Sequence, residues 1–154
     1  MQVEITTEPA RRLAAVRHVG PYNQIGRAFA QLGHTLGPWM PDLAERGAMM
    51  ALYHDDPRTV PPDRLRADAA MVVPDDFVLP ADLVELHLPS GRYASTVHVG
   101  PYEQLGEVWQ RFMSEWLPVS GERASASPSV ETYLNNPETT LRADWRTRLS
   151  IPLA

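Results

Sequence analysis

The sequence predicts an α+β fold in which two tandem strand–helix–strand–strand units form a curved antiparallel sheet with both helices on one face. The main observation is an internal repeat. HVGPYNQIGRAFAQL at residues 18–32 and HVGPYEQLGEVWQRF at residues 98–112 are identical at seven of fifteen positions. The same spacing of 80 residues relates YHDDP at 53–57 to YLNNP at 133–137. A register kept through a helix and into the next strand indicates a tandem duplication.

Each unit opens with a strand and a helix. Residues 12–18 and 92–98 are rich in small, β-branched and apolar side chains, as strands are. A Gly-Pro pair then ends each strand and fixes φ for the first helical turn. The apolar side chains that follow are three or four residues apart, which predicts two amphipathic helices: Tyr22, Ile25, Phe29, Leu32 and Leu36, then Tyr102, Leu105, Val108, Trp109, Phe112 and Trp116. We expect Gly37-Pro38 and Pro118 to end these helices.

Two more strands complete each unit. Residues 48–53 and 130–134 are strand-like and end at Asp/Asn-Pro turns, and residues 67–73 and 145–153 supply the closing strands. Residues 3–6 and 83–88 are expected to add an edge strand before the first and the second unit. Residues 1–154 then form one domain of two pseudo-symmetric halves, about 1–73 and 82–154, joined by a linker at 74–81. The gap between the two helices is the expected binding groove, because ligand clefts often lie where packed units meet.

The composition excludes several classes of protein. The chain has 154 residues, 44% of them hydrophobic and 21% charged, as in globular domains. No apolar run could span a bilayer, and the N-terminus does not resemble a secretory signal. Without cysteine there is no disulfide, thiolate zinc site or cysteine nucleophile. The net charge of −5, with only scattered arginines as basic residues, argues against direct contact with nucleic acid. We therefore expect a cytoplasmic protein that contacts neither membrane nor nucleic acid.

The repeated motifs also resemble a known family. The paired HVGPYNQ and HVGPYEQLG segments, the YHDDP turn followed by Arg66, and the run PSVETYLNNPE…DWRTRLSIPL together resemble the GyrI-like domain over roughly residues 2–153. This family includes a DNA gyrase inhibitory protein and the effector-binding domains of AraC-type and MerR-type transcription regulators. The resemblance implies two SHS2-like units and a groove with aromatic walls and one acidic residue, which holds amphipathic or cationic small molecules. It places that acidic residue in VETYL, at Glu131.

The repeat singles out Glu131 as well, because its counterpart 80 residues earlier is Ala51 and the fold therefore does not demand a carboxylate there. Strand alternation places Glu131 and Tyr133 on one face. A carboxylate among aromatic rings is costly unless it is paired or hydrogen-bonded, so it would have a raised pKa or bind a cationic ligand. The alternative is a solvated or arginine-paired glutamate in the strand.

Four aromatic residues are the other candidates for the site. Tyr53 and Tyr133 are counterparts in the repeat, and with Trp109 and Trp145 they could form a cage that holds a cation over the ring faces. The alternative for these residues is plain core packing. We expect the tyrosine of each Gly-Pro-Tyr motif to anchor its helix.

Other kinds of site have little support. His18 and His98 are counterparts but belong to no cluster of metal ligands, so we expect no metal and no cofactor. No GxSxG-like motif positions a serine nucleophile. The Asp55-Asp56-Pro57 segment indicates a turn rather than a metal loop.

Three functions follow from these observations. The first is a stand-alone binding protein that captures hydrophobic, cationic compounds for drug or toxin sensing or sequestration, with Glu131 as the counter-charge. The second is a hydrolase of reactive cyclopropane-type genotoxins with Glu131 as general base, a reaction that the resemblance suggests. The third is a protein that inhibits DNA gyrase or acts on a separate regulator. The first is favoured because the sequence offers aromatic residues and one carboxylate but no evident acid–base pair.

Overall fold

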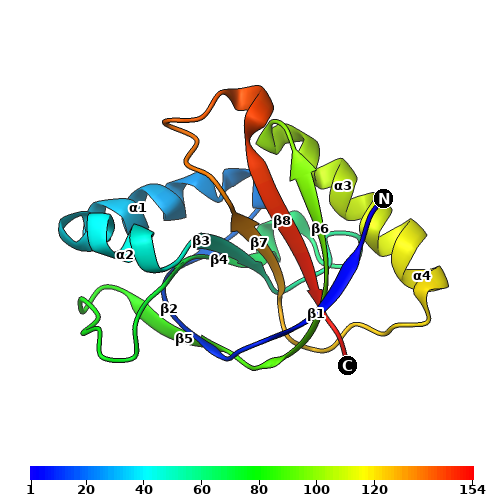
Figure 1. Cartoon of the computed structure of the whole chain (residues 1–154), viewed down its shortest axis with the longest axis horizontal. Coiled ribbons are helices and arrows are strands. Elements are labelled where there is room, and N and C mark those ends of the chain that lie inside the picture. Colours follow the sequence, from blue (N-terminus) through cyan, green and yellow to red (C-terminus); the bar gives the residue numbers. More distant parts are fainter. The chain divides into compact units, whose positions relative to one another are not determined.

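The computed structural model describes all 154 residues and divides them into two compact units. The first unit consists of residues 9–90, and the second unit consists of residues 1–8 and 91–154. Each unit contains four antiparallel strands and a helical segment (Figure 1). Three of the strands and the helical segment follow one another in the order strand, helix, strand, strand, and the fourth strand lies at the edge of the sheet. The predicted α+β fold with a tandem strand–helix–strand–strand unit is therefore confirmed.

In the first unit the strands lie in the order β3-β4-β2-β5. Their bounds are Arg11–Val19 for β2, Met49–Tyr53 for β3, Arg66–Val72 for β4 and Val84–Leu88 for β5. Helix α1 (Gly26–Leu36) packs on β2 and β4, and α2 (Met40–Arg46) follows it. The face of α1 that carries Ala28, Leu32 and Leu36 is buried against apolar side chains of β2 and β4, because these residues recur at helical spacing.

In the second unit the order is β1-β6-β8-β7. Their bounds are Glu4–Glu8 for β1, Gly91–Val99 for β6, Ser129–Tyr133 for β7 and Arg146–Pro152 for β8. Helix α3 (Leu105–Arg111) runs through a π-helical turn (Phe112–Trp116) into α4 (Leu117–Ser120). Leu105 and the fully buried Phe112 pack against β6 and β8. None of the helices in either unit is long and apolar enough to cross a lipid bilayer.

Helix α1 ends at Leu36, directly before Gly37-Pro38 as predicted, whereas the prediction that Pro118 ends the helix of the second unit is wrong. A 3-10 turn at Gly37–Trp39 follows α1 directly, and the chain continues into α2; in the second unit Pro118 lies inside the first turn of α4. At Pro38 a proline costs little, because the amide groups of the first turn after a helix end have no acceptor within the new turn. Each proline thus lies in the first turn of the helical segment that follows it.

The two leading strands form, but each pairs within the unit of the other half. Strand β1 pairs with β6, and β5 pairs with β2. Only Pro9 and Ala10 separate β1 from β2, and only Pro89 and Ser90 separate β5 from β6. A two-residue hairpin needs positive φ at its first central residue, whereas proline holds φ near −65°. The chain therefore cannot fold back at these points, and each leading strand takes another partner.

A glycine with positive φ marks the end of the first long strand in each unit. Gly20 has φ 136° and Gly100 has φ 138°. Their amides donate hydrogen bonds to the carbonyl oxygens of Leu65 and Trp145, at 2.8 and 2.7 Å. The backbone hydrogen bond thus holds each Gly-Pro junction to the start of the closing strand.

We predict that Gly20→Ala and Gly100→Ala each lower the free energy of unfolding by about 1–3 kcal/mol, because a Cβ atom is strained at this φ. Gly100→Ala should cost more, since its Cβ would lie 2.7 Å from Oε1 of Gln104, whereas the Cβ at Gly20 meets nothing closer than 3.7 Å. Urea unfolding measures both. Gly33→Ala in α1, where a Cβ meets nothing within 4 Å, is the control and should not destabilise. A neutral Gly100→Ala variant would contradict the prediction.

Candidate functional site

Glu131 is the centre of a polar and aromatic cluster in the second unit. Only 4% of its surface is exposed. Nε1 of Trp109 donates a hydrogen bond to Oε1 of Glu131 at 2.7 Å, and the hydroxyl of Tyr133 donates one to Oε2 at 2.8 Å. Both donors are neutral, so these bonds stabilise the ionised carboxylate without cancelling its charge.

The local structure explains how these three side chains meet. Residues 131 and 133 are two positions apart on β7, so they point to the same face of the sheet, as predicted from strand alternation. That face is the one covered by α3, because Leu149, opposite Glu131 on β8, belongs to the core under this helix. Trp109 lies one helical turn after Leu105 in α3, which directs its indole toward the strand.

Two aromatic contacts extend the cluster. The ring of Tyr102 lies 5.3 Å from that of Tyr133 and stacks on Trp145 at 4.4 Å with an interplanar angle of 30°. Trp145 is fixed in turn by a hydrogen bond from its Nε1 to the carbonyl of Thr140 at 3.1 Å. All of these rings are partly exposed, so a ligand can reach them.

The predicted site residues are thus only partly brought together. Glu131, Trp109 and Tyr133 are in direct contact, and Trp145 joins them through Tyr102. Tyr53 lies in the first unit, where its ring is 4.7 Å from that of Tyr22.

Tyr102 is the residue that the sequence reasoning missed, because it was expected only to anchor its helix. The duplication offered the missing comparison. In the first unit the hydroxyl of Tyr22 donates to the carbonyls of Asp55 and Arg66 at 2.9 and 3.1 Å, and it accepts a bond from the amide of Asp55. The acidic Asp55 of the turn corresponds to Asn135 in the second unit. There the Tyr102 hydroxyl makes no hydrogen bond within the chain and remains available to a ligand.

The two units differ at three positions of the cluster. The positions of Glu131, Trp109 and Trp145 are occupied in the first unit by alanine, phenylalanine and leucine, at residues 51, 29 and 65. The contact between the helix tyrosine and the strand tyrosine is instead present in both units. The tyrosine pair is therefore part of the fold, whereas the carboxylate and the two tryptophans belong to the second unit alone.

The first unit buries a carboxylate of its own on the other face of its sheet. Asp68 is 2% exposed, and it accepts hydrogen bonds from Nε of Arg17 at 2.7 Å and from Nε2 of His54 at 2.5 Å. Burial raises the pKa of Asp68, but the hydrogen bonds from these two partners lower it by more, so the pKa lies below its ordinary value of 3.8. The guanidinium of Arg17 therefore balances this charge, whereas the hydrogen bonds that Glu131 accepts from Trp109 and Tyr133 come from neutral groups.

The structure contains no group of three or more histidine and acidic side chains arranged to hold a metal ion. His18 and His98 act at the strand–helix junctions, where their Nε2 atoms lie 2.9 Å from the carbonyl of Pro21 and from Oε1 of Gln104. Asp55 forms an ion pair with Arg66 at 2.8 Å.

The charge of Glu131 also acts on Tyr102. Burial raises the pKa of Tyr102 above its ordinary value of 10.0, and the negative charge of Glu131 raises it further. Tyr102 therefore stays a neutral hydroxyl at physiological pH, able to donate as well as accept a hydrogen bond. The cluster offers aromatic faces, one negative charge and one hydroxyl without a partner.

We predict that Glu131→Gln lowers the pKa of Tyr102, because the substitution removes the negative charge that opposes its ionisation. An NMR titration of the tyrosine Cζ signals measures this. Tyr22 is the internal control: burial also raises its pKa, but the charges that act on it come from the first unit, so it should not move. An unchanged Tyr102, or an equal shift of both tyrosines, would contradict this electrostatic assignment.

Comparison with known proteins shows the family to which the chain belongs. The family model described as the GyrI-like small molecule binding domain matches residues 1–154. A protein named DNA gyrase inhibitor from Serratia proteamaculans is 39% identical over 146 residues, covering 90% of each chain. One of the same name from Erwinia billingiae is 30% identical and covers 100% of this chain and 98% of its own.

Solved structures share the fold at lower identity. The C-terminal domain of EcmrR has a TM-score of 0.78 at 18% identity, covering 99% of this chain and 97% of its own. SAV2435, solved bound to tetraphenylphosphonium, has a TM-score of 0.67 at 12% identity and covers 100% of this chain and 94% of its own. The match over the whole chain and the curated relatives agree, and the protein belongs to the GyrI-like small-molecule-binding domain family.

Proposed function

We propose that the cluster around Glu131 binds a hydrophobic cation, and that the protein senses or sequesters such compounds. The observation that carries this proposal is the buried carboxylate of Glu131, held by the neutral donors Trp109 and Tyr133 among partly exposed aromatic rings. A charge in such surroundings is costly to bury, and a cationic ligand would offset that cost.

The aromatic rings supply the second half of the recognition. Tryptophan and tyrosine attract cations over their ring faces, and the attraction is stronger where water is excluded. Three rings offer such faces, because the ring of Tyr102 contacts those of both Tyr133 and Trp145. SAV2435, which shares the fold, was solved with tetraphenylphosphonium, a cation that carries four aromatic rings. The same compound is a suitable probe here.

We expect tetraphenylphosphonium to raise the melting temperature and to quench tryptophan fluorescence saturably. At about a hundred times its dissociation constant a ligand adds roughly 2.7 kcal/mol of stability, or about 5–10 °C for a chain of this size. Glu131→Gln should lose most of the shift, since the counter-charge is gone. Glu107→Gln, which removes an exposed carboxylate from the same helix α3, should retain the shift.

The sign of the ligand charge is tested with tetraphenylborate, an anion of nearly the same shape. Glu131 should repel it, so we expect little shift in the unsubstituted protein and a larger one in Glu131→Gln. Equal shifts with both ions would show binding by hydrophobic contact alone and would contradict the proposed role of the carboxylate.

Inhibition of DNA gyrase is a second candidate function, favoured by relatives of that name at 30–39% identity. If the protein inhibits gyrase through its surface, the purified chain should lower gyrase supercoiling of a relaxed plasmid, and Glu131→Gln should inhibit equally. Loss of inhibition in this variant, with its melting temperature retained, would instead link gyrase inhibition to the cation site. No effect of the unsubstituted chain at any concentration would contradict this candidate.

A further inference from the structure

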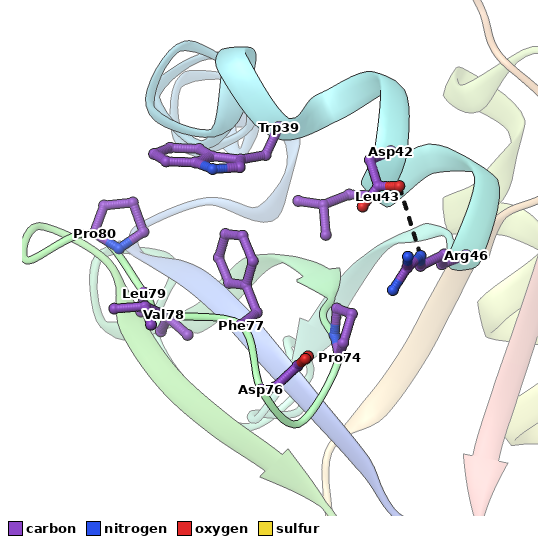
Figure 2. Close-up of a pocket in the computed structure, with 10 residues that line it drawn as sticks. All are labelled: Trp39, Asp42, Leu43, Arg46, Pro74, Asp76, Phe77, Val78, Leu79 and Pro80. Atoms are coloured by element: carbon purple, nitrogen blue, oxygen red, sulfur yellow. Dashed lines mark ion pairs between the residues drawn. The ribbon is translucent and has the colours of Figure 1, made fainter.

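A concave site lies in the first unit. Residues 74–80, part of the segment expected as a linker, face α2 and the turn before it across a pocket of about 610 Å³ (Figure 2). This volume falls within the usual range of ligand pockets. Its lining is mostly apolar and includes Trp39, Leu43, Pro74, Phe77 and Pro80.

Hydrogen bonds from Arg12 hold one wall of the pocket in place. The guanidinium of Arg12 donates hydrogen bonds to the carbonyl oxygens of Pro74 and Phe77, at 2.9 and 2.6 Å, and its Nε is 2.6 Å from Oε1 of Glu85. The side chain of Arg12 is only 15% exposed. Phe77 packs against the hydrophobic core of the unit. Because one largely buried guanidinium binds two carbonyls of the segment, this wall of the pocket exists before any partner binds.

An exposed tryptophan forms the opposite wall. Trp39 is 43% exposed, and its ring meets Phe77 edge to face at 5.7 Å (Figure 2). Its counterpart 80 residues later is Val119, and the preceding Pro38 aligns with Pro118, so the repeated unit does not require an aromatic residue there. Val78 at the rim is 84% exposed. Apolar surface thus continues beyond the pocket itself, as it does at sites where another protein docks.

The charges of the lining favour a cation. The lining carries two carboxylates, from Asp42 and Asp76, against one guanidinium, from Arg46. Nε of Arg46 lies 3.6 Å from Oδ1 of Asp42, so each largely offsets the other. Asp76 is exposed at the edge of the pocket beside the apolar wall (Figure 2). The lining therefore has a net charge of −1 next to an indole face.

We infer that this pocket docks a protein segment that presents an arginine between apolar residues. A guanidinium is weakly hydrated and stacks well on an indole ring, and arginine is enriched in protein interfaces. Its aliphatic stem would lie along the exposed part of the Trp39 indole, its charge would approach Asp76, and the flanking apolar side chains would cover Val78. A small aromatic cation would leave Val78 uncovered.

The test uses the acetylated and amidated peptide Gly-Leu-Arg-Leu-Gly and its citrulline analogue, which has nearly the same shape but no charge. Two-dimensional ¹H–¹⁵N NMR of the full chain follows the indole signal of Trp39 and the amides of residues 75–79. We expect saturable shifts with a dissociation constant of about 1 mM, and binding of the citrulline peptide about fivefold weaker, the factor for one exposed ion pair.

Substitutions give changes of opposite sign. Asp76→Asn should weaken arginine-peptide binding about fivefold, whereas Arg46→Gln should strengthen it, because it removes the competing cation. Trp39→Val should abolish arginine-peptide binding; valine is the residue at the counterpart position 119. Glu131→Gln in the second unit should leave it unchanged. Three of these substitutions, at Asp76, Arg46 and Trp39, are at exposed sites, whereas Glu131 is buried. Thermal melting checks that each variant is folded.

Three outcomes would overturn the inference. The first is the absence of saturable shifts at about 10 mM peptide, a concentration well above the expected dissociation constant. The second is equal affinity for the arginine and citrulline peptides. The third is tighter binding of phenethylammonium than of the peptide at the same signals, which would assign the pocket to small aromatic cations.

Discussion

Each unit depends on one backbone hydrogen bond at its Gly-Pro-Tyr junction. The amide of Gly100 binds the carbonyl of Trp145, and positive φ at this glycine turns the chain from β6 toward the helix. Proline then sets the first helical turn and delivers Tyr102 beside Tyr133. The same bond fixes the residue whose indole stacks on Tyr102. The aromatic wall of the candidate site is therefore a direct product of the junction that also begins the helix.

The duplication lets one half of the molecule serve as a control for the other. Both halves keep the glycine junction and the tyrosine pair, which shows that these features serve the fold. Only the second unit adds Glu131 and its tryptophan donor, and only the first adds the ion-paired Asp68. Two related scaffolds thus bury a carboxylate in different ways. In the first unit the guanidinium of Arg17 pairs with it, and in the second unit Trp109 and Tyr133 donate hydrogen bonds from neutral groups.

Much of this was predictable from the sequence, because periodicity and repetition report on local structure directly. The strands followed from their composition and the turns that bound them, and the helices and the shared face of Glu131 and Tyr133 followed from spacing. The pairing of β1 with β6 did not, since strand partners are set by which turns the chain can make, and here Pro9 prevents the nearest one. The role of Tyr102 could not be predicted from the sequence either. Its position is the same as that of Tyr22, and only the hydrogen bonds of the hydroxyl separate them.

The exchange of leading strands has a consequence for how the chain acquires its structure during synthesis. Residues 9–90 are contiguous, so the first unit has all its strands once Leu88 has left the ribosome. Strand β1 is made before any of them, yet its partner β6 is made only after all of them. Strand β1 therefore remains unpaired until the whole first unit has been synthesised, and contacts between such distant segments form slowly. The half that carries the candidate ligand site is completed only when β1 pairs with the later strand β6, so this half matures last.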